Sequence, residues 1–242
     1  MGFHRKAASI KIKRAYGVLL ATYGLRGWWP VSPDGAVAAV YEPGRDPRRL
    51  TAGQRLEICW GCILAQNTSW KNAAVAVERL RREKLMGLPE MLRCGERQLA
   101  QTIRSSGYYN QKASKLKALA AFFGNNPGWE LEETLLLRRK LLSVRGVGQE
   151  TADSILLYAL GRPRFVVDAY TRRIFHRIGI TTEAAGYEDI QKIVESSGLE
   201  MMGFAEYHAL LVELAKRHCT KHHPACGGCP LNFAQVRSQI SL

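Results

Sequence analysis

Apolar residues recur along most of this chain at steps of three and four positions, the spacing that places them on one face of an α-helix. Seven segments carry the pattern, at 50–66, 71–82, 96–104, 111–123, 131–142, 150–160 and 169–178. Chains patterned in this way bury their apolar surface by packing helix against helix. The spacing therefore predicts an all-α protein.

Local signals mark the boundaries of several of these helices. Thr51 followed by Gln54 forms a capping-box pattern, and Pro89 suits the first turn of a helix. Glycine- and proline-rich breaks occur at 87–89 and 124–128. We therefore expect one helix to begin after Thr51 and another at Pro89.

The chain is strongly basic, with 35 Lys and Arg against 21 Asp and Glu, a formal net charge of +14 and a pI of about 9.8. This excess indicates a polyanionic partner such as a nucleic acid, although a generally basic surface gives the same count. With 242 residues, 46% of them hydrophobic, the chain can form one large domain or two lobes that share a core.

No run approaches the roughly 18–20 consecutive apolar residues of a membrane span, and the N-terminal region lacks the apolar core of a signal peptide. We therefore expect a cytoplasmic protein of a bacterium or archaeon, with no membrane association. In that compartment the sequon at 67–69 is a chance match, and the six cysteines are thiols or metal ligands rather than a disulfide framework. Cys59, Cys62 and Cys94 fit the helical patterns as small apolar residues, so we assign them no chemistry.

Gly146, Val147 and Gly148 separate two of the helical patterns and predict a tight hairpin. The backbone N–H groups of such a turn, aligned with the dipole of the next helix, can hold a phosphate. A Gly-x-Gly between helices is usually only a turn. Here, however, it is followed after one helix by the Gly- and Pro-containing segment 161–168, which ends in Asp168. Its strand-like run 164–167 is flanked by Pro and Asp, and we expect an extended loop there.

This combination resembles the endonuclease III superfamily, in which a helix-hairpin-helix motif leads to a Gly/Pro-rich loop that ends in an essential aspartate. The resemblance covers roughly residues 17–230. It implies two helical lobes with a cleft between them. One is a six-helix barrel at 34–162 that includes the helix-hairpin-helix at about 137–160, and the other is formed by both termini, 1–33 and 163–242. It further implies a monomeric DNA-repair N-glycosylase that binds double-stranded DNA with a damaged base.

By this resemblance Asp168 is the catalytic carboxylate at the mouth of the cleft. Cleavage of an N-glycosidic bond builds positive charge on the sugar, and a fixed anion near C1′ stabilises that charge or deprotonates the attacking water. Asp168 also stands where it would N-cap the helix at 169–178. The two roles are compatible because one residue can begin a helix and face the cleft.

Family members that also cleave the DNA strand carry a lysine two residues after the second hairpin glycine, where it forms an imine with the sugar. Glu150 stands at that position here. A carboxylate cannot form an imine, so water is the expected nucleophile and no AP lyase activity is expected. Glu150 also suits the first turn of a helix, where the helix dipole favours an anion, and this is the role that we expect for it.

Three further stretches, at 28–30, 66–70 and 108–112, look like the type III 3-methyladenine DNA glycosylases. That resemblance implies a base pocket formed by Trp28, Trp29, Pro30, Trp70, Glu150 and Lys216, and DNA contacts by Gln66, Gly146, Val147, Gly148 and Thr151. Gln66 would fill the gap that the flipped base leaves.

The chemistry of the substrate fits such a pocket. N-alkylation makes a purine cationic and a better leaving group, and indole faces bind it by stacking and cation–π attraction. Ordinary explanations remain for two of these features. Adjacent tryptophans such as Trp28 and Trp29 are often core residues, and Lys216 could be a solvated helix lysine.

Cys219, Cys226 and Cys229 repeat the spacing of the first three ligands in the superfamily's iron–sulfur loop, whose fourth cysteine would fall at Gln235. Three readings stay open. The cysteines could hold an iron–sulfur cluster together with another ligand, a zinc site could use one of the nearby histidines His218, His222 and His223, or the site has decayed.

The sequence thus predicts a water-using DNA glycosylase that excises flipped alkylated purines such as 3-methyladenine. A bifunctional endonuclease III-like glycosylase/AP lyase for oxidised bases is one alternative, disfavoured by Glu150. A DNA-binding homologue without catalysis is another, disfavoured by Asp168 together with the aromatic residues.

Overall fold

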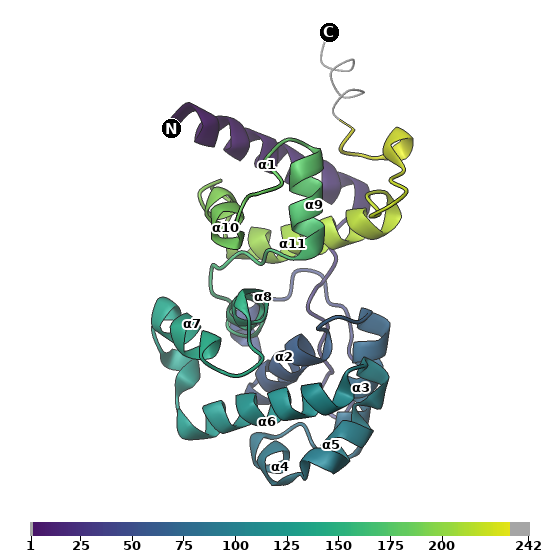
Figure 1. Cartoon of the computed structure of the whole chain (residues 1–242), viewed down its shortest axis with the longest axis vertical. Helices are drawn as coiled ribbons and strands as arrows, with labels where there is room; N and C mark the ends of the chain where they lie inside the picture. The colour runs from purple at the N-terminus through teal and green to yellow at the C-terminus, as the bar shows by residue number, and fades with distance from the viewer. Residues whose placement is uncertain (1, 233–242) are drawn as a thin grey trace. The chain divides into compact units, whose positions relative to one another are not determined.

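The computed structural model describes residues 2–232, which form eleven α-helices (Figure 1). Within this range there is no strand, only an isolated antiparallel bridge between Val31 and Val40. The all-α prediction is confirmed. None of the helices in the described range is both long and apolar enough to cross a bilayer.

The chain divides into two compact units, which we describe separately. Unit 1 comprises Met1–Trp28 and Pro163–Leu242, and unit 2 comprises Trp29–Arg162. The lobes expected from the sequence had their boundaries at 33/34 and 162/163.

Unit 2 contains seven of the α-helices and three short 3₁₀ turns. The α-helices are α2 (Ala52–Leu64), α3 (Trp70–Arg82), α4 (Leu88–Arg93), α5 (Glu96–Thr102), α6 (Tyr109–Asn125), α7 (Thr134–Leu142) and α8 (Gln149–Ser154), and the turns are η1 (Pro47–Arg49), η2 (Arg104–Ser106) and η3 (Trp129–Leu131). A π-helical turn, η4 (Ile155–Ala159), directly follows α8. The six segments predicted between residues 50 and 160 all form helix.

Two of the predicted helix starts are seen in detail. The Thr51 hydroxyl accepts from Gln54 N at 3.3 Å, and the Gln54 side chain accepts from Thr51 N at 3.1 Å. Pro89 lies in the first turn of α4. Both predictions are confirmed.

The core of unit 2 forms around α2, which contacts α3, α6, α8 and η4. Trp60 of α2 is fully buried, and its ring centroid lies 5.8 Å from that of Phe123. Phe123 in turn stacks on Trp129 with ring centroids 4.2 Å apart. The aromatic residues of α2, α6 and η3 thus pack into one cluster.

A buried ion pair joins the two helices that flank the hairpin. Arg138 of α7 donates to both carboxylate oxygens of Asp153 of α8, at 2.8 and 3.0 Å. The Asp153 side chain is 0% exposed and that of Arg138 is 11% exposed. The pair fixes α7 against α8 in the helix-hairpin-helix.

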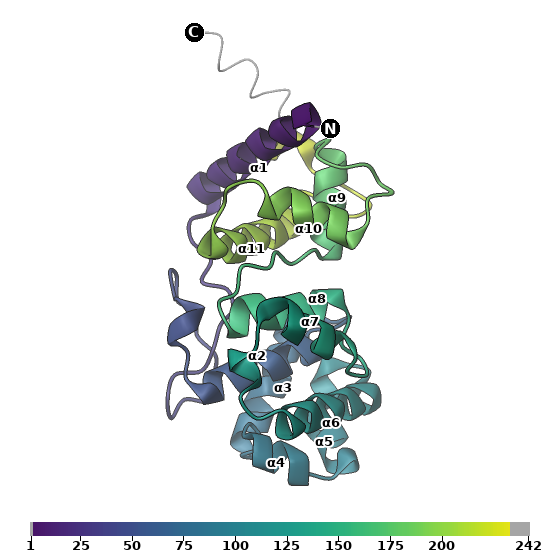
Figure 2. The same ribbon diagram turned by 90° about the vertical axis from the view of Figure 1, so that its left-hand side faces the viewer.

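Unit 1 contains the other four α-helices and one 3₁₀ turn, namely α1 (Gly2–Tyr23), α9 (Ala169–Arg177), α10 (Tyr187–Glu195), α11 (Met201–Arg217) and η5 (Cys226–Gly228). α1 packs against α10 and α11, and α9 packs against α11 (Figure 2). The fully buried Tyr207 of α11 lies at the centre, with its ring centroid 6.0 Å from those of both Phe165 and Phe175. α1, α10 and α11 were not among the segments that the apolar spacing predicted to be helical.

Candidate active site

The segment 163–167 has no regular secondary structure, and its residues 165–167 are buried. Side chains of α10 bind its backbone. Phe165 N donates to the Glu195 carboxylate at 3.0 Å, Gln191 donates to Phe165 O at 2.7 Å, and Val167 N donates to the Tyr187 hydroxyl at 3.4 Å. The extended loop expected here is confirmed, and these contacts hold it in one conformation up to Asp168.

Asp168 is the N-cap of α9, as expected, and is only 9% exposed. Its Oδ1 accepts from Thr171 N at 2.7 Å, and its Oδ2 lies 3.5 Å from Nε2 of His208 on α11. Burial favours the neutral acid, but the hydrogen bond and charge of His208 and the hydrogen bonds of Thr171 outweigh it, so the pKa of Asp168 lies below its usual value. Asp168 is therefore a buried carboxylate that is ionised at neutral pH.

Trp29 lies in an aromatic cluster of unit 2. Its ring centroid is 5.1 Å from that of Trp70 in an edge-to-face arrangement and 5.6 Å from that of Tyr158 in η4. Gly61 of α2 packs directly against Trp29. A Cβ at position 61 would lie 3.1 Å from the Trp29 indole, so the absence of a side chain makes room for the ring. Trp29 is only 9% exposed, so most of its surface is used for packing, whereas Trp70 is half-buried.

The remaining pocket candidates lie at different kinds of position. Trp28 belongs to unit 1 and is half-buried, and Pro30 is buried in unit 2. Lys216 is exposed in the last turn of α11. Glu150 is exposed in the first turn of α8, which is the helix position expected for it.

Gln66 is bound to the hairpin. Its Nε2 donates to Gly146 O at 3.0 Å and to the Thr151 hydroxyl at 2.9 Å, and its Oε1 accepts from Lys115 Nζ at 2.7 Å. The Lys115 stem also covers Gly146, which has a φ of +87° and where a Cβ would meet that stem at 2.3 Å. The loop after α2, α6 and the hairpin are therefore joined at one point, and this position requires glycine.

Within the hairpin, Val147 differs from Gly148 in its exposure and in its hydrogen bonding. Val147 is buried, and its N–H donates to Val144 O at 3.0 Å inside the turn. Gly148 is the exposed N-cap of α8 and offers no capping side chain to the first-turn amides. The N-terminal end of α8 is thus better suited to a phosphate than the Val147 amide is.

Sequence reasoning missed two buried residues near these candidates, His208 and Lys112. Lys112 of α6 is 1% exposed and donates to Leu64 O at 2.8 Å and to Ser106 O at 2.7 Å. Burial and the neighbouring Lys115 lower the pKa of Lys112 to about 8. The contact joins α6 to the C-terminal end of α2, and no local pattern of the sequence indicates it.

The cysteines of α2 carry no sign of reactivity. Cys59 and Cys62 are buried, and burial raises the pKa of both thiols. This agrees with their expected role as small apolar residues.

Cys219, Cys226 and Cys229 line one cavity of about 300 Å³ with His218. Burial raises the pKa of the Cys229 thiol, and the nearby Cys219 and Cys226 raise it further. Within residues 2–232, however, no three His, Cys, Asp or Glu side chains are arranged to hold a metal ion. Gln235 lies outside the described residues. The described residues therefore provide three thiols at one cavity without the convergence that a metal cluster needs.

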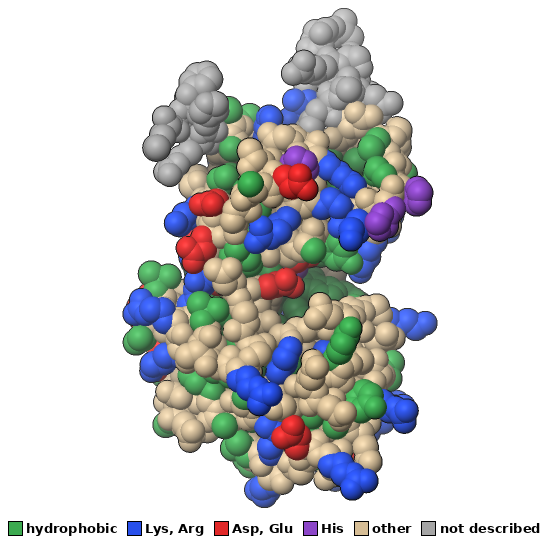
Figure 3. Space-filling view, in the orientation of Figure 1, with side chains coloured by type: hydrophobic (Ala, Val, Ile, Leu, Met, Phe, Trp, Pro, Cys, Tyr) green, Lys and Arg blue, Asp and Glu red, His purple; other side chains and the backbone are tan. Residues whose placement is uncertain are grey.

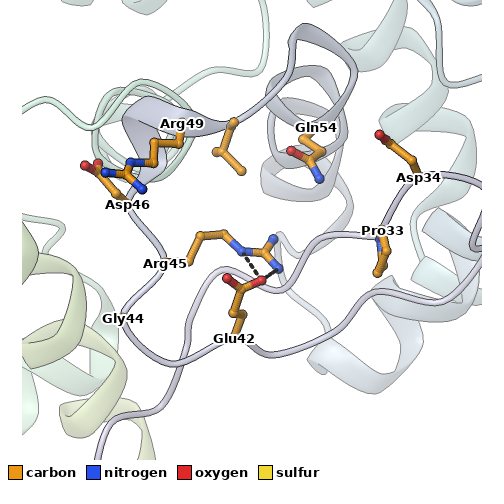
Figure 4. Close-up of a pocket in the computed structure, with 9 residues that line it drawn as sticks. Pro33, Asp34, Glu42, Gly44, Arg45, Asp46, Arg49 and Gln54 are labelled. Atoms are coloured by element: carbon orange, nitrogen blue, oxygen red, sulfur yellow. Dashed lines mark hydrogen bonds and ion pairs between the residues drawn. The ribbon is translucent and has the colours of Figure 1, made fainter.

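A larger cavity of about 630 Å³ lies in unit 2 between the segment 33–50 and the start of α2 (Figure 4). Arg45 and Glu42 meet on its wall, with Arg45 Nε donating to the Glu42 carboxylate at 3.1 Å. None of the predicted site residues lines this cavity.

On the face of the molecule in Figure 3, Lys and Arg side chains predominate over acidic ones.

Comparison with known proteins gives consistent matches. The model of the HhH-GPD superfamily of base excision DNA repair proteins matches residues 60–198. A candidate DNA repair glycosylase from Methanocaldococcus jannaschii is 42% identical over 229 residues, which cover 91% of this chain and 93% of the relative. Endonuclease III from Sulfolobus acidocaldarius is 27% identical over 69% of this chain and 75% of its own.

Solved structures match the fold. A non-covalent endonuclease III–DNA complex aligns with a TM-score of 0.71 at 19% identity, over 96% of this chain and 98% of that one. The 3-methyladenine DNA glycosylase of Helicobacter pylori, bound to 1,N6-ethenoadenine, aligns with a TM-score of 0.66 at 23% identity, over 87% of this chain and 97% of that one. The fold is therefore endonuclease III-like, as the sequence resemblance implied.

Proposed function

Because the chain belongs to the HhH-GPD superfamily of base excision DNA repair proteins and is a DNA glycosylase, we propose that it is a monofunctional enzyme for flipped, N-alkylated purines such as 3-methyladenine. One observation carries the proposal. Glu150 occupies the hairpin position of the imine-forming lysine in a chain that also has the Trp29, Trp70 and Tyr158 cluster. The similarity in fold to the 3-methyladenine DNA glycosylase of Helicobacter pylori supports the proposed substrate class.

In the proposed reaction, Asp168 is the anion that stabilises positive charge on the sugar or takes a proton from the attacking water. Its ionised state and its two fixed contacts, to Thr171 N and His208, suit a preorganised charge. An alkylated purine already carries positive charge and leaves readily, so recognition matters more than protonation of the leaving group. The half-buried indole of Trp70 offers a face for that recognition.

The buried amine of Lys112 is poorly placed to act as a nucleophile. Lys112 has a pKa of about 8, which would suit imine formation, but its Nζ is bonded to two backbone carbonyls and the residue is 1% exposed. Glu150 cannot form an imine. Water is therefore the proposed nucleophile, and an abasic site in an intact strand is the proposed product.

The proposal is tested by incubating the protein with alkylated DNA and with oxidised DNA, identifying released bases by mass spectrometry and examining the strand on a denaturing gel. We expect release of N-alkylated purines, an intact strand and no covalent complex after borohydride treatment, which traps only imines. A trapped complex, or release of thymine glycol with strand cleavage, would instead support the bifunctional endonuclease III-like alternative.

Truncation of Trp70 to Ala should weaken transition-state binding of an alkylated base by about 1–3 kcal/mol, the usual loss for one stacking partner. Single-turnover base release measures this effect. Trp70→Phe is the matched control, since it keeps a flat face and should retain most of the rate. Affinity for undamaged duplex should change little in either variant because phosphate contacts dominate it. Equal losses on damaged and undamaged DNA would show that Trp70 has no part in base recognition.

The three thiols do not converge on a metal position in the described residues, so for the cysteine loop we propose an iron–sulfur cluster on Cys219, Cys226 and Cys229 only on the basis of their sequence spacing, as the first occupant to test. Purified protein should then contain iron and show broad visible absorption. Colourless protein with one equivalent of zinc would favour the zinc reading, and metal-free, folded protein would favour a decayed site.

A further inference from the structure

His208 is the residue of α11 that faces Asp168. It is 7% exposed, and its Nε2 lies 3.5 Å from Asp168 Oδ2. The neighbouring Tyr207 is fully buried against Phe165 and Phe175, so the core fixes α11 at this point of the chain. Packing of α11 in the core therefore fixes the position of the His208 imidazole.

The two oxygens of the Asp168 carboxylate have different partners. Oδ1 accepts from Thr171 N at 2.7 Å, which belongs to the helix that Asp168 caps, whereas Oδ2 faces the imidazole of another helix. Rotation of the carboxylate would disrupt both contacts at once. Each carboxylate oxygen can accept more than one hydrogen bond, so these contacts leave capacity for a water or a sugar.

We propose that His208 is a positioning residue for base excision, which holds Asp168 in the orientation and charge state that the reaction needs. The inference rests on the proposed role of Asp168. His208 itself does not touch the substrate. It acts by completing the environment of the carboxylate, as the outer partners of catalytic groups do.

The energetic reason is the burial of Asp168. A carboxylate removed from water is costly unless it is paired or hydrogen-bonded, and burial alone raises its pKa. His208 contributes most to lowering the pKa of Asp168, while Thr171 contributes hydrogen bonds and Tyr187 of α10 binds the loop through Val167. Without His208, burial still raises the pKa of Asp168, and the largest contribution that lowers this pKa is lost. Protonation of Asp168 then moves to higher pH.

Two variants separate orientation from charge. His208→Gln can donate a hydrogen bond but carries no charge, and His208→Ala does neither. His176→Gln is the matched control because His176 lies exposed on α9, the helix that Asp168 caps. Thermal unfolding of each protein shows whether it remains folded.

The first measurement needs no substrate. The titration of the Asp168 carboxyl carbon is followed by ¹³C NMR in the wild type, His208→Gln and His176→Gln. We expect the midpoint to move to higher pH in His208→Gln only. An unchanged midpoint in folded His208→Gln would overturn the proposal, whatever lesion the enzyme acts on.

The second measurement is the pH profile of single-turnover base release. His208→Ala should be slower by roughly 10- to 100-fold, the range for losing a group that orients a catalytic ligand, with unchanged affinity for duplex that contains an abasic-site analogue. The acid limb should shift to higher pH in both variants, and His208→Gln should recover rate above that limb. Wild-type profiles in both variants would refute the proposal. A wild type that releases no alkylated base would refute the proposed substrate instead and leave the NMR result standing.

Discussion

Replacement of Asp168 by Asn is expected to slow base release by at least about 10³-fold and to leave DNA affinity nearly unchanged. In the proposed mechanism the carboxylate stabilises the positive charge that develops on the sugar, and a neutral amide cannot supply that stabilisation. The fold should survive, because Asn is as good an N-cap as Asp and can still accept from Thr171 N. Single-turnover assays and binding to an abasic-analogue duplex measure the two quantities.

Asp189→Asn provides the matched control for this substitution. Asp189 lies exposed in the first turn of α10, where its carboxylate accepts from Gly186 N at 3.2 Å. The chemical change and the helix position are therefore similar, and base release should stay near the wild-type rate. Undiminished turnover by Asp168→Asn would remove Asp168 from the mechanism.

Asp153→Ala should lower the free energy of unfolding by about 3–5 kcal/mol, the range for removing one partner of a buried ion pair. Arg138 would be left nearly buried with its partner carboxylate gone, at the junction of α7 and α8. Denaturant unfolding followed by tryptophan fluorescence measures the loss. Four of the five tryptophans lie in unit 2, so the signal reports mainly on the unit that contains the pair.

A double variant, Arg138→Met with Asp153→Leu, tests whether the penalty comes from the buried charge of Arg138. Replacing both partners by apolar residues removes that charge, so the double variant should be more stable than Asp153→Ala alone. If the double variant loses as much stability as Asp153→Ala or more, the main contribution of the pair would be its specific contacts rather than its balance of charge.

Much of the fold follows from local signals in the sequence. The capping box at Thr51, the proline at the start of α4 and the three- to four-residue apolar spacing act within a few residues of one another, so the sequence alone reveals them. The same holds for Asp168, where a strand-like run ends and a helical pattern begins. Its N-cap geometry was predictable for that reason.

Two of the three helices outside the predicted segments, α1 and α10, were missed for a different reason. Over residues 7–23, α1 buries a narrow stripe formed by Ile12, Ala15 and Leu19, and basic residues are frequent along the rest of that range. α10 is short, and two of its polar side chains, Gln191 and Glu195, bind the loop before Asp168. Neither helix shows the broad apolar face on which the prediction relied.

The role of His208, which the sequence missed, and the hydrogen bonds of Gln66 depend on contacts between distant segments. His208 stands in sequence between Tyr207 and Ala209 on an apolar helix, and only its distance to Asp168 gives it a role. Gln66 was expected to enter the DNA, and the unbound structure shows its amide bonded to the hairpin and Lys115. Such contacts join residues more than 35 positions apart, beyond the reach of any local pattern.

The loop before Asp168 has a consequence for how such an active site can diverge. In a β-sheet, an extended segment is held by the backbone of its neighbour, which amino-acid replacement barely alters. Here the segment is held by the side chains of Tyr187, Gln191 and Glu195, each of which is encoded separately. Single replacements on α10 can therefore move the Asp168 carboxylate by small steps without changing the residues that are proposed to bind the base. The position of Asp168, the proposed catalytic anion, can in this sense evolve separately from the residues proposed to select the lesion.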